Sequence, residues 1–312
     1  MPLVLRHALG LGKAVTVTLE FNANLPLAHT ALDRDYSARE QPNLFGQLWS
    51  AGVALVLPMH NQRVPLTSSG ELKFLSTSEV DQSAALAYLG IDLASGLPVV
   101  LAVVEDLSSG DWHELRRSGL GLSPRDAAIF TQALALTNWH ESHRFCPKCG
   151  TLTVVERAGW VRRCPSDNQE LFPRTDPAVI VGVIDDQDRI LLGSQGVWEE
   201  NRYSILAGFV EPGESLEAAV VREMQEEAGI LVSNVKYLGS QAWPFPYSLM
   251  LGYTAKFSGG TVQPDGEEIV KLRWFSRAEL KAESNQLLLP GRLSIARAII
   301  EHWLGEELTE GE

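Results

Sequence analysis

The sequence predicts an α+β protein built from about three parts. Its 312 residues are enough for roughly two domains with cores of their own. Hydrophobic residues make up 45% of the chain and charged residues 21%, which is typical of a folded globular protein. Strand-like runs fill the first third. A helical segment and a cysteine cluster then separate them from strands and a helix in the last part.

Residues 1–122 are expected to form a β-rich amino-terminal domain. Short apolar or alternating runs at 53–58 and 72–75 lie between Gly, Ser and Asn clusters. Residues 88–92 and 97–104 are also strand-like. Because turn-forming residues separate these runs, we expect strands joined by turns.

Composition and charge exclude several classes of partner. Asp92, Gly96 and Pro98 interrupt the apolar stretch 84–104, which indicates strand, turn and strand rather than a membrane span. Residues 1–6 lack a basic segment followed by an apolar core. The net charge of −13 disfavours tight sequence-independent binding to DNA. We therefore expect a cytoplasmic protein without membrane or DNA partners.

A linking helix is predicted from Ser123 onward. Ser123 is a good N-cap, Pro124 suits the first helical position, and Asp126 complements the positive end of the helix dipole. The apolar face extends to Trp139. Its residues are Ile129, Phe130, Ala133, Leu134 and Leu136.

Three cysteines, Cys146, Cys149 and Cys164, lie close together in the sequence. An odd, clustered number argues against a disulfide framework. It indicates a metal site or free thiols in a reducing compartment. We expect residues 123–172 to hold the linking helix and this cysteine-rich segment.

A hairpin is predicted where the last part begins. Residues 178–184 are an apolar run typical of a buried strand, and 185–188 form an acidic turn. The apolar run 190–192 returns the chain.

The segment 208–230 is the most acidic of the chain, with six Glu and one Arg. Ser215 is a suitable N-cap for a helix over 216–228, and Gly229 ends it. The apolar strip that would dock this helix consists of Leu216, Ala219, Val220 and Met224.

Glu223, Glu226 and Glu227 share one face of this helix, because they stand at i, i+3 and i+4. Like charges this close repel each other, so a cation is expected among them. Oxygen-only ligands select Mg²⁺ or Mn²⁺, which bind phosphate oxygens and offset the charge that develops when water attacks. Arg222 can pair with Glu226. Three Glu at helical spacing also leave open a solvated acidic face.

The spacing of this segment resembles the Nudix box at every fixed position. These positions are Gly208, Glu214, Arg222, Glu223, Met224, Glu226, Glu227, Gly229 and Ile230. The resemblance implies a Nudix hydrolase, which cleaves a nucleoside diphosphate linked to another group. It implies a Nudix α/β/α sandwich over residues 173–312, with metal held by Glu223, Glu226 and Glu227 and by the backbone carbonyl of Ala207.

A second motif, SQAWPFPYS at 240–248, points to the substrate. Its prolines fix backbone angles and its aromatic rings offer faces for a base, although a packed proline-aromatic loop is the alternative. The order resembles the motif SQPWPFPxS of NADH pyrophosphatases, a branch that also removes NAD caps from RNA. That resemblance, over about residues 112–300, implies a set of substrate contacts. They are Gln241, Ala242, Trp243, Pro244, Phe245, Pro246, Tyr247 and Ser248. Ala242 replaces a Pro of the motif, so we expect a less pre-organised loop but the same substrate class.

Five further positions gain roles only through this resemblance. Glu268 takes the place of an additional metal-binding Glu, and Ala296 that of a residue at the adenine end. Phe172 and Phe209 align with aromatic residues that hold the nicotinamide ring from different subunits, which implies a homodimer. Arg116 matches a substrate-contacting Arg, although a solvated surface Arg fits equally well.

The resemblance also implies a zinc ribbon at the cysteine cluster. Its relatives carry four Cys, and here Asp167, a legitimate zinc ligand, holds the fourth place. The implied site is Cys146, Cys149, Cys164 and Asp167. Completion of the site by His143 and a ribbon without metal both stay open.

The reaction implied is metal-dependent hydrolysis of the pyrophosphate in NADH, NAD⁺ or an NAD-capped RNA 5′ end. Products would be nicotinamide mononucleotide and AMP, or RNA with a 5′ monophosphate. Glu227 is expected to be the most critical carboxylate, with Glu223, Glu226 and Arg222 beside it. Two rivals remain: another diphosphate substrate such as ADP-ribose or a dinucleoside polyphosphate, and a catalytically silent RNA-binding module. The complete set of glutamates argues against the silent module.

Overall fold

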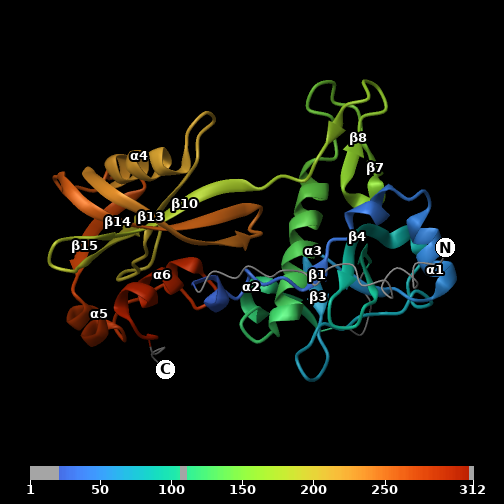
Figure 1. Cartoon of the computed structure of the whole chain (residues 1–312), viewed down its shortest axis with the longest axis horizontal. Coiled ribbons are helices and arrows are strands. Elements are labelled where there is room, and N and C mark those ends of the chain that lie inside the picture. The colour runs from blue at the N-terminus through green and yellow to red at the C-terminus, as the bar shows by residue number, and fades with distance from the viewer. Residues whose placement is uncertain (1–20, 106–110, 309–312) are drawn as a thin grey trace.

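The computed structural model describes residues 21–105 and 111–308, so the expectation about residues 1–6 lies outside the described range. Figure 1 shows two domains side by side, with a long helix between them and the small region that contains β7 (Val154–Glu156) and β8 (Val161–Arg163) above the amino-terminal domain. Within the described ranges, no helix combines the length and the apolar character needed to cross a membrane.

The amino-terminal domain is built on a four-stranded sheet in the order β1-β4-β5-β2. Strands β2 and β5 are parallel, and the other neighbours are antiparallel. Two further strands, β3 and β6, form a separate antiparallel pair. The bounds are β1 Leu32–Asp33, α1 Leu44–Ala51, β2 Leu55–Met59, β3 Arg63–Pro65, β4 Ala85–Asp92, β5 Pro98–Val103 and β6 Trp112–Glu114.

The sequence predicted β2, β4 and β5 at nearly these positions, and this is confirmed. The run 72–75 is different, because it forms only isolated bridges, from Leu72 to Leu66 and from Leu75 to Val56. It lies between tight turns at 67–70 and 76–79, which leave too little extended chain for a ladder.

Helix α3 (Pro124–Ser142) stands between the two domains in Figure 1 and follows the short helix α2 (Leu115–Ser118). The predicted start is confirmed, since the Ser123 hydroxyl accepts a hydrogen bond from the Asp126 N–H at 3.1 Å. The helix runs three residues past Trp139. Its predicted apolar face is buried in the core of the amino-terminal domain.

The cysteine-rich segment that follows α3 folds as a small three-stranded antiparallel sheet in the order β7-β8-β9. These strands are β7 Val154–Glu156, β8 Val161–Arg163 and β9 Glu170–Leu171. His140 ties α3 to this sheet, because its ring lies 2.9 Å from the Gly159 carbonyl oxygen and 3.0 Å from the Arg162 guanidinium.

The carboxy-terminal domain is a mixed six-stranded sheet between helices. Its order is β13-β14-β10-β11-β15, with β12 paired to β10, and β10 and β14 are parallel. The strands are β10 Asp176–Ile184, β11 Ile190–Gln195, β12 Leu206–Phe209, β13 Ile230–Trp243, β14 Ser248–Gly260 and β15 Ile269–Phe275. The helices are α4 Leu216–Ala228, α5 Arg277–Glu283 and α6 Ile295–Leu304.

Alternation along β10 explains why helices cover both faces of this sheet. Val179, Val181 and Val183 pack into the core under α4, whereas Ile180 packs into the core that contains α6. Figure 1 shows α4 on one side of the sheet and α6 on the other. The domain is therefore the α/β/α sandwich of the Nudix fold that the resemblance implied.

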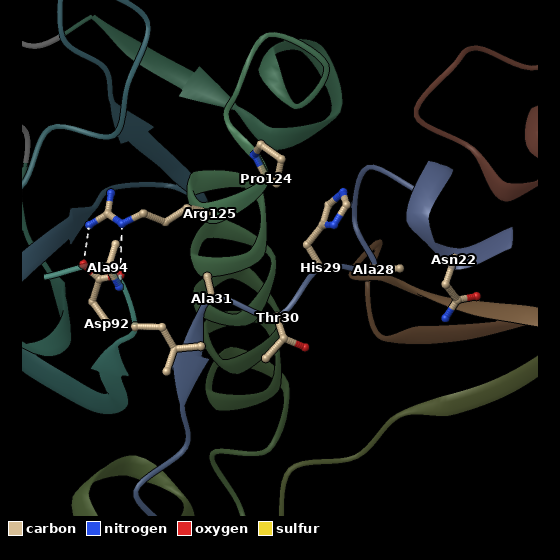
Figure 2. Close-up of a pocket in the computed structure, with 10 residues that line it drawn as sticks. Asn22, Ala28, His29, Thr30, Ala31, Asp92, Ala94, Pro124 and Arg125 are labelled. Atoms are coloured by element: carbon tan, nitrogen blue, oxygen red, sulfur yellow. Dashed lines mark hydrogen bonds and ion pairs between the residues drawn. The ribbon is translucent and has the colours of Figure 1, made fainter. Parts of the chain in front are cut away.

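The segment around residues 21–32 joins the two domains. Phe21 and Leu25 are buried in the core beside α6, whereas Leu32 is buried in the core of the amino-terminal domain. A cavity of about 460 Å³ lies along this segment, next to the start of α3 (Figure 2). Its Arg125 binds the buried Asp92 through two hydrogen bonds of 3.0 Å, so the cation is already neutralised.

Candidate active site

Helix α4 places the three candidate glutamates. It spans the predicted residues, begins with a hydrogen bond from the Ala218 N–H to the Ser215 hydroxyl at 3.2 Å, and ends at Gly229 with φ of 67°. Its apolar residues Ala219, Val220 and Met224 are fully buried, as predicted.

The three carboxylates differ in burial more than a common face suggests. Glu223 and Glu227 are 8% and 5% exposed, whereas the side chain of Glu226 is 59% exposed. Positions i and i+4 lie over the sheet, and position i+3 is turned to the rim of the helix. The buried pair thus forms the inner part of the candidate site.

Arg222 holds this cluster in place. It donates two hydrogen bonds to Glu214, at 2.8 and 2.9 Å, and one each to Glu223 at 2.9 Å and Glu226 at 2.8 Å. The predicted pair with Glu226 is confirmed. A further bond of 2.9 Å reaches the Phe209 carbonyl oxygen at the end of β12. The hydrogen bonds to Glu214 and the other carboxylates raise the pKa of Arg222, so it acts as a fixed cation.

Gly208 lets β12 approach α4 closely. A Cβ atom at this position would lie only 1.8 Å from the Glu223 carboxyl carbon. The neighbouring Ala207, whose carbonyl is a candidate metal ligand, pairs with Ile180 in the middle of the sheet. The first glycine of the box is therefore required by the contact between strand and helix.

Glu227 is the most perturbed group of the site. Burial, followed by the charges of Glu223, Glu268 and Asp265, raises its pKa to about 8. Its Oε2 atom is buried and has no hydrogen-bond partner in the described part of the chain. A divalent cation fits this position, because it would pair the orphaned oxygen and lower the repulsion among the carboxylates.

The charge of Glu268 lies close enough to help raise the pKa of Glu227. Glu268 itself is exposed and accepts a hydrogen bond from Gln195 at 3.0 Å. Asp265, on the same loop, accepts hydrogen bonds from three backbone N–H groups of residues 267–269. It thereby shapes the loop that carries Glu268, a role that the sequence analysis did not assign.

A cavity of about 190 Å³ adjoins Glu227. It brings together four predicted residues: Ala207, Glu227, Trp243 and Ala296. Gln195 and Trp198 also line it, and sequence reasoning missed both of them. They belong to the end of β11 and the loop after it, a segment without a motif, so only the pairing of β11 with β15 reveals their place.

The second motif is divided between two places. Gln241 and Ala242 lie in β13, where Gln241 is buried and donates to the Leu293 carbonyl at 2.8 Å. Ala242 pairs with Leu249 of β14, so the ladder restrains its backbone even without the proline ring. Pro244, Phe245, Pro246 and Tyr247 connect the two strands and line a separate cavity of about 500 Å³, and Ser248 begins β14.

Three other predicted residues lie away from the cavity beside Glu227. Phe172 and Phe209 are 56% and 59% exposed, and the ring contacts among the described residues include neither of them. The guanidinium carbon of Arg116 lies 4.2 Å from the centre of the Phe245 ring, a stacking contact with the second motif.

The cysteine cluster assembles as four potential ligands. Single ligand atoms of Cys146, Cys149, Cys164 and Asp167 all lie within 4.8 Å of one another. Each half of the site is a tight turn, closed by hydrogen bonds from Gly150 to Cys146 and from Asn168 to Cys164, both 2.9 Å. Residues 150 and 168 both have positive φ, at 72° and 60°. Asp167 thus takes the place in the second turn that Cys149 takes in the first.

His143 is not part of this group of ligands. Its ring lies 6.3 Å from the Tyr247 ring, and its Nδ1 is 2.9 Å from the Ser142 hydroxyl. Three thiols and a carboxylate at this spacing fit a tetrahedral zinc ion.

Three features define the carboxy-terminal domain as a Nudix domain. Helix α4 of the α/β/α sandwich carries buried carboxylates, a glycine of β12 lets the strand approach them, and a cavity adjoins one of them. In agreement, residues 174–294 match the NUDIX domain family, and residues 141–172 match the NADH pyrophosphatase zinc ribbon domain. The chain belongs to the Nudix hydrolase family, among the members that join this domain to such a ribbon.

Two curated relatives are named NAD-capped RNA hydrolase NudC. That of Pseudomonas syringae pv. syringae is 40% identical over 223 residues, which cover 70% of this chain and 77% of the relative. That of Mycobacterium tuberculosis (strain H37Rv) is 45% identical over 206 residues, and the chain spans 64% of its length. A solved Nudix hydrolase from Nitrosomonas europaea is 22% identical, with a TM-score of 0.41 over 54% of this chain and 96% of that one.

Proposed function

We propose that this protein hydrolyses the pyrophosphate bond of NADH or NAD⁺ to nicotinamide mononucleotide and AMP, and removes NAD caps from RNA 5′ ends. The observation that carries the proposal is the buried, unpaired Oε2 of Glu227 beside a cavity that also contains Trp243 and Ala296. Such a cavity offers a charged end for phosphate and an aromatic face for a base. The names of the two NudC relatives support the same substrates.

Mg²⁺ or Mn²⁺ would be held by Glu223, Glu226, Glu227 and Glu268, with the carbonyl of Ala207. When bound, the metal would neutralise the diphosphate and help to activate water. Glu227, buried and with an unpaired Oε2 beside the cavity, is placed either to hold the metal or to accept a proton from the attacking water. Arg222 is suited to restrain the carboxylates of Glu223 and Glu226, because it donates a hydrogen bond to each.

The substrate contacts remain part of this proposal. Trp243 and Ala296 line the cavity beside Glu227, and the prolines of the second motif shape the turn next to Trp243. Phe172 and Phe209 are exposed, which suits two residues that meet across a homodimer around the nicotinamide ring. We extend the proposal to that homodimer, to domain boundaries near 122 and 172, and to a cytoplasmic location that keeps the three thiols reduced.

The test is product analysis of NADH incubated with the purified protein and Mg²⁺ or Mn²⁺. We expect reduced nicotinamide mononucleotide and AMP, with a higher kcat/KM than for ADP-ribose or a dinucleoside polyphosphate. Glu227→Gln keeps the shape of the side chain and should lower kcat by about 100-fold or more. Glu217→Gln, an exposed glutamate in the first turn of α4, is the matched control and should leave kcat unchanged.

Two results would contradict the proposal. Near-normal turnover by Glu227→Gln would remove the assigned role of this carboxylate. A preference for ADP-ribose over NADH would move the protein to another substrate of the same class, and inactivity toward every diphosphate would favour the silent RNA-binding module.

A further inference from the structure

The turn between β13 and β14, Pro244–Tyr247, is held by β10 at Tyr247, whose carbonyl accepts from the Asp176 N–H at 2.9 Å, and from outside its own domain at the two prolines. Both prolines lack a backbone N–H, and the turn has one short internal bond, from the Phe245 N–H to the Trp243 carbonyl at 2.7 Å. The carbonyl oxygens of Pro244 and Pro246 therefore need donors from elsewhere.

Asn138 of α3 supplies both donors. Its side-chain amide nitrogen lies 3.0 Å from the Pro244 carbonyl oxygen and 2.9 Å from that of Pro246. The residue is only 7% exposed, so these bonds are shielded from water. Its Oδ1 is buried and unpaired in the described part of the chain, which is unfavourable for stability. The two bonds donated to the turn therefore exist at a site where the oxygen of the same amide is left unpaired.

Arg116 of α2 contacts the same turn. Its guanidinium carbon is 4.2 Å from the Phe245 ring centre and 5.3 Å from the Trp243 ring centre. The two aromatic rings are themselves in edge contact, with their centres 5.0 Å apart. Both α2 and α3 lie outside the carboxy-terminal domain, and Figure 1 shows α3 beside it.

We propose that Asn138 is a positioning residue for substrate binding. Its two hydrogen bonds fix the turn so that Trp243 lines the cavity beside Glu227. The candidate metal-binding carboxylates lie on α4 and on the loop before β15, and α3 does not carry them. Loss of the bonds is therefore expected to weaken substrate binding without altering the chemical step. The kinetic part of this inference rests on the proposed function; the structural part does not.

The test compares Asn138→Ala with Gln132→Ala. Gln132 lies on the same helix, is equally buried, and donates to the Leu89 carbonyl at 2.8 Å in the amino-terminal domain. Asn138→Ala should raise KM for NADH about tenfold and leave kcat within about twofold. Gln132→Ala should leave both constants unchanged. Asn138→Ser, a milder change, serves if the alanine variant does not fold, and should raise KM at least about threefold.

A second measurement needs no substrate. Amide hydrogen exchange of the peptide that covers residues 243–250 should become at least about tenfold faster in Asn138→Ala and stay unchanged in Gln132→Ala. If the wild type does not hydrolyse NADH, the proposed function fails and the exchange result alone decides the role of Asn138. Unchanged exchange, unchanged KM, or a fall in kcat at constant KM would each overturn the inference.

Discussion

Glu223 illustrates at the scale of one residue how a buried charge is accommodated. Burial raises its pKa, and the hydrogen bond from Arg222 acts against that effect. Its carboxylate also occupies the space that a side chain at position 208 would need. Because both neighbours are fixed, the carboxylate has little freedom to turn away from the site.

The variant Gly208→Ala tests this packing. The added methyl group would overlap the Glu223 carboxylate, so we expect a loss of about 1–3 kcal/mol in the free energy of unfolding. We also expect at least a tenfold fall in kcat, because the carboxylate must move. Gly291→Ala is the control, since its Cβ meets nothing within 4 Å. Thermal unfolding measures the first effect and NADH turnover the second. A fully active Gly208→Ala would contradict the requirement for a glycine beside Glu223.

At the scale of one element, the ribbon is built from two similar turns that face each other. The first carries Cys146 and Cys149, and the second carries Cys164 and Asp167. The sulfur atoms of Cys149 and Cys164 are 3.5 Å apart, as are the sulfur of Cys146 and one oxygen of Asp167. Because the turns have the same backbone pattern, a carboxylate can replace the fourth thiolate without rearrangement.

Metal analysis of protein purified without added zinc tests the ribbon. We expect about one zinc per chain in the wild type and clearly less in Asp167→Ala. Asp167→Cys restores four thiolates and should bind zinc at least as well. His143→Ala should keep its zinc. A loss of zinc in His143→Ala, together with retention in Asp167→Ala, would assign the fourth ligand to the histidine.

At the scale of the whole molecule, α3 connects the parts that the sequence keeps far apart. Its start is joined to the end of β4 by the ion pair of Arg125 and Asp92, next to the cavity of Figure 2. Its middle packs into the amino-terminal core, Asn138 holds the turn of the second motif, and His140 contacts the ribbon. Each of these contacts thus joins α3 to a different part of the chain.

The dependence of stability on acid pH tests the ion pair of Arg125 and Asp92. Burial would raise the pKa of Asp92, but hydrogen bonds from Arg125 and Ser95 and from the Ala94 N–H lower it to about 2. The unfolded carboxyl has a pKa near 3.9. The native pair therefore contributes its full stability above about pH 4 and loses it as the pH falls toward about 2.

Asp92→Asn should consequently be less stable than the wild type at pH 7, by about 2 kcal/mol. The difference should shrink as the pH is lowered from about 4 toward about 2. Urea unfolding at several pH values measures it, and Asp186→Asn, in an exposed turn, is the control. A difference that does not change with pH would show that Asp92 acts through its shape alone.

Local signals let the sequence predict α3, α4 and the hairpin of β10 and β11, but they did not predict β12 to β15, α5 or α6. The caps at Ser123 and Ser215 depend on a hydroxyl and the next few N–H groups, and the apolar strips depend on helical spacing. The box resemblance likewise located α4 and its glutamates. At 72–75, where two turns shorten the extended chain, the local pattern predicted a strand but the structure has only isolated bridges.

What the sequence determined by itself is the set of candidate groups: the carboxylates of α4, the four potential ligands of the ribbon, and the aromatic turn. Only the tertiary structure decided which of them meet. Gln195 and Trp198 reach Glu227 through the sheet, and Asn138 reaches Pro244 across 106 residues of sequence. Burial and orphaned polar atoms arise from such long-range contacts, which local periodicity and caps do not encode.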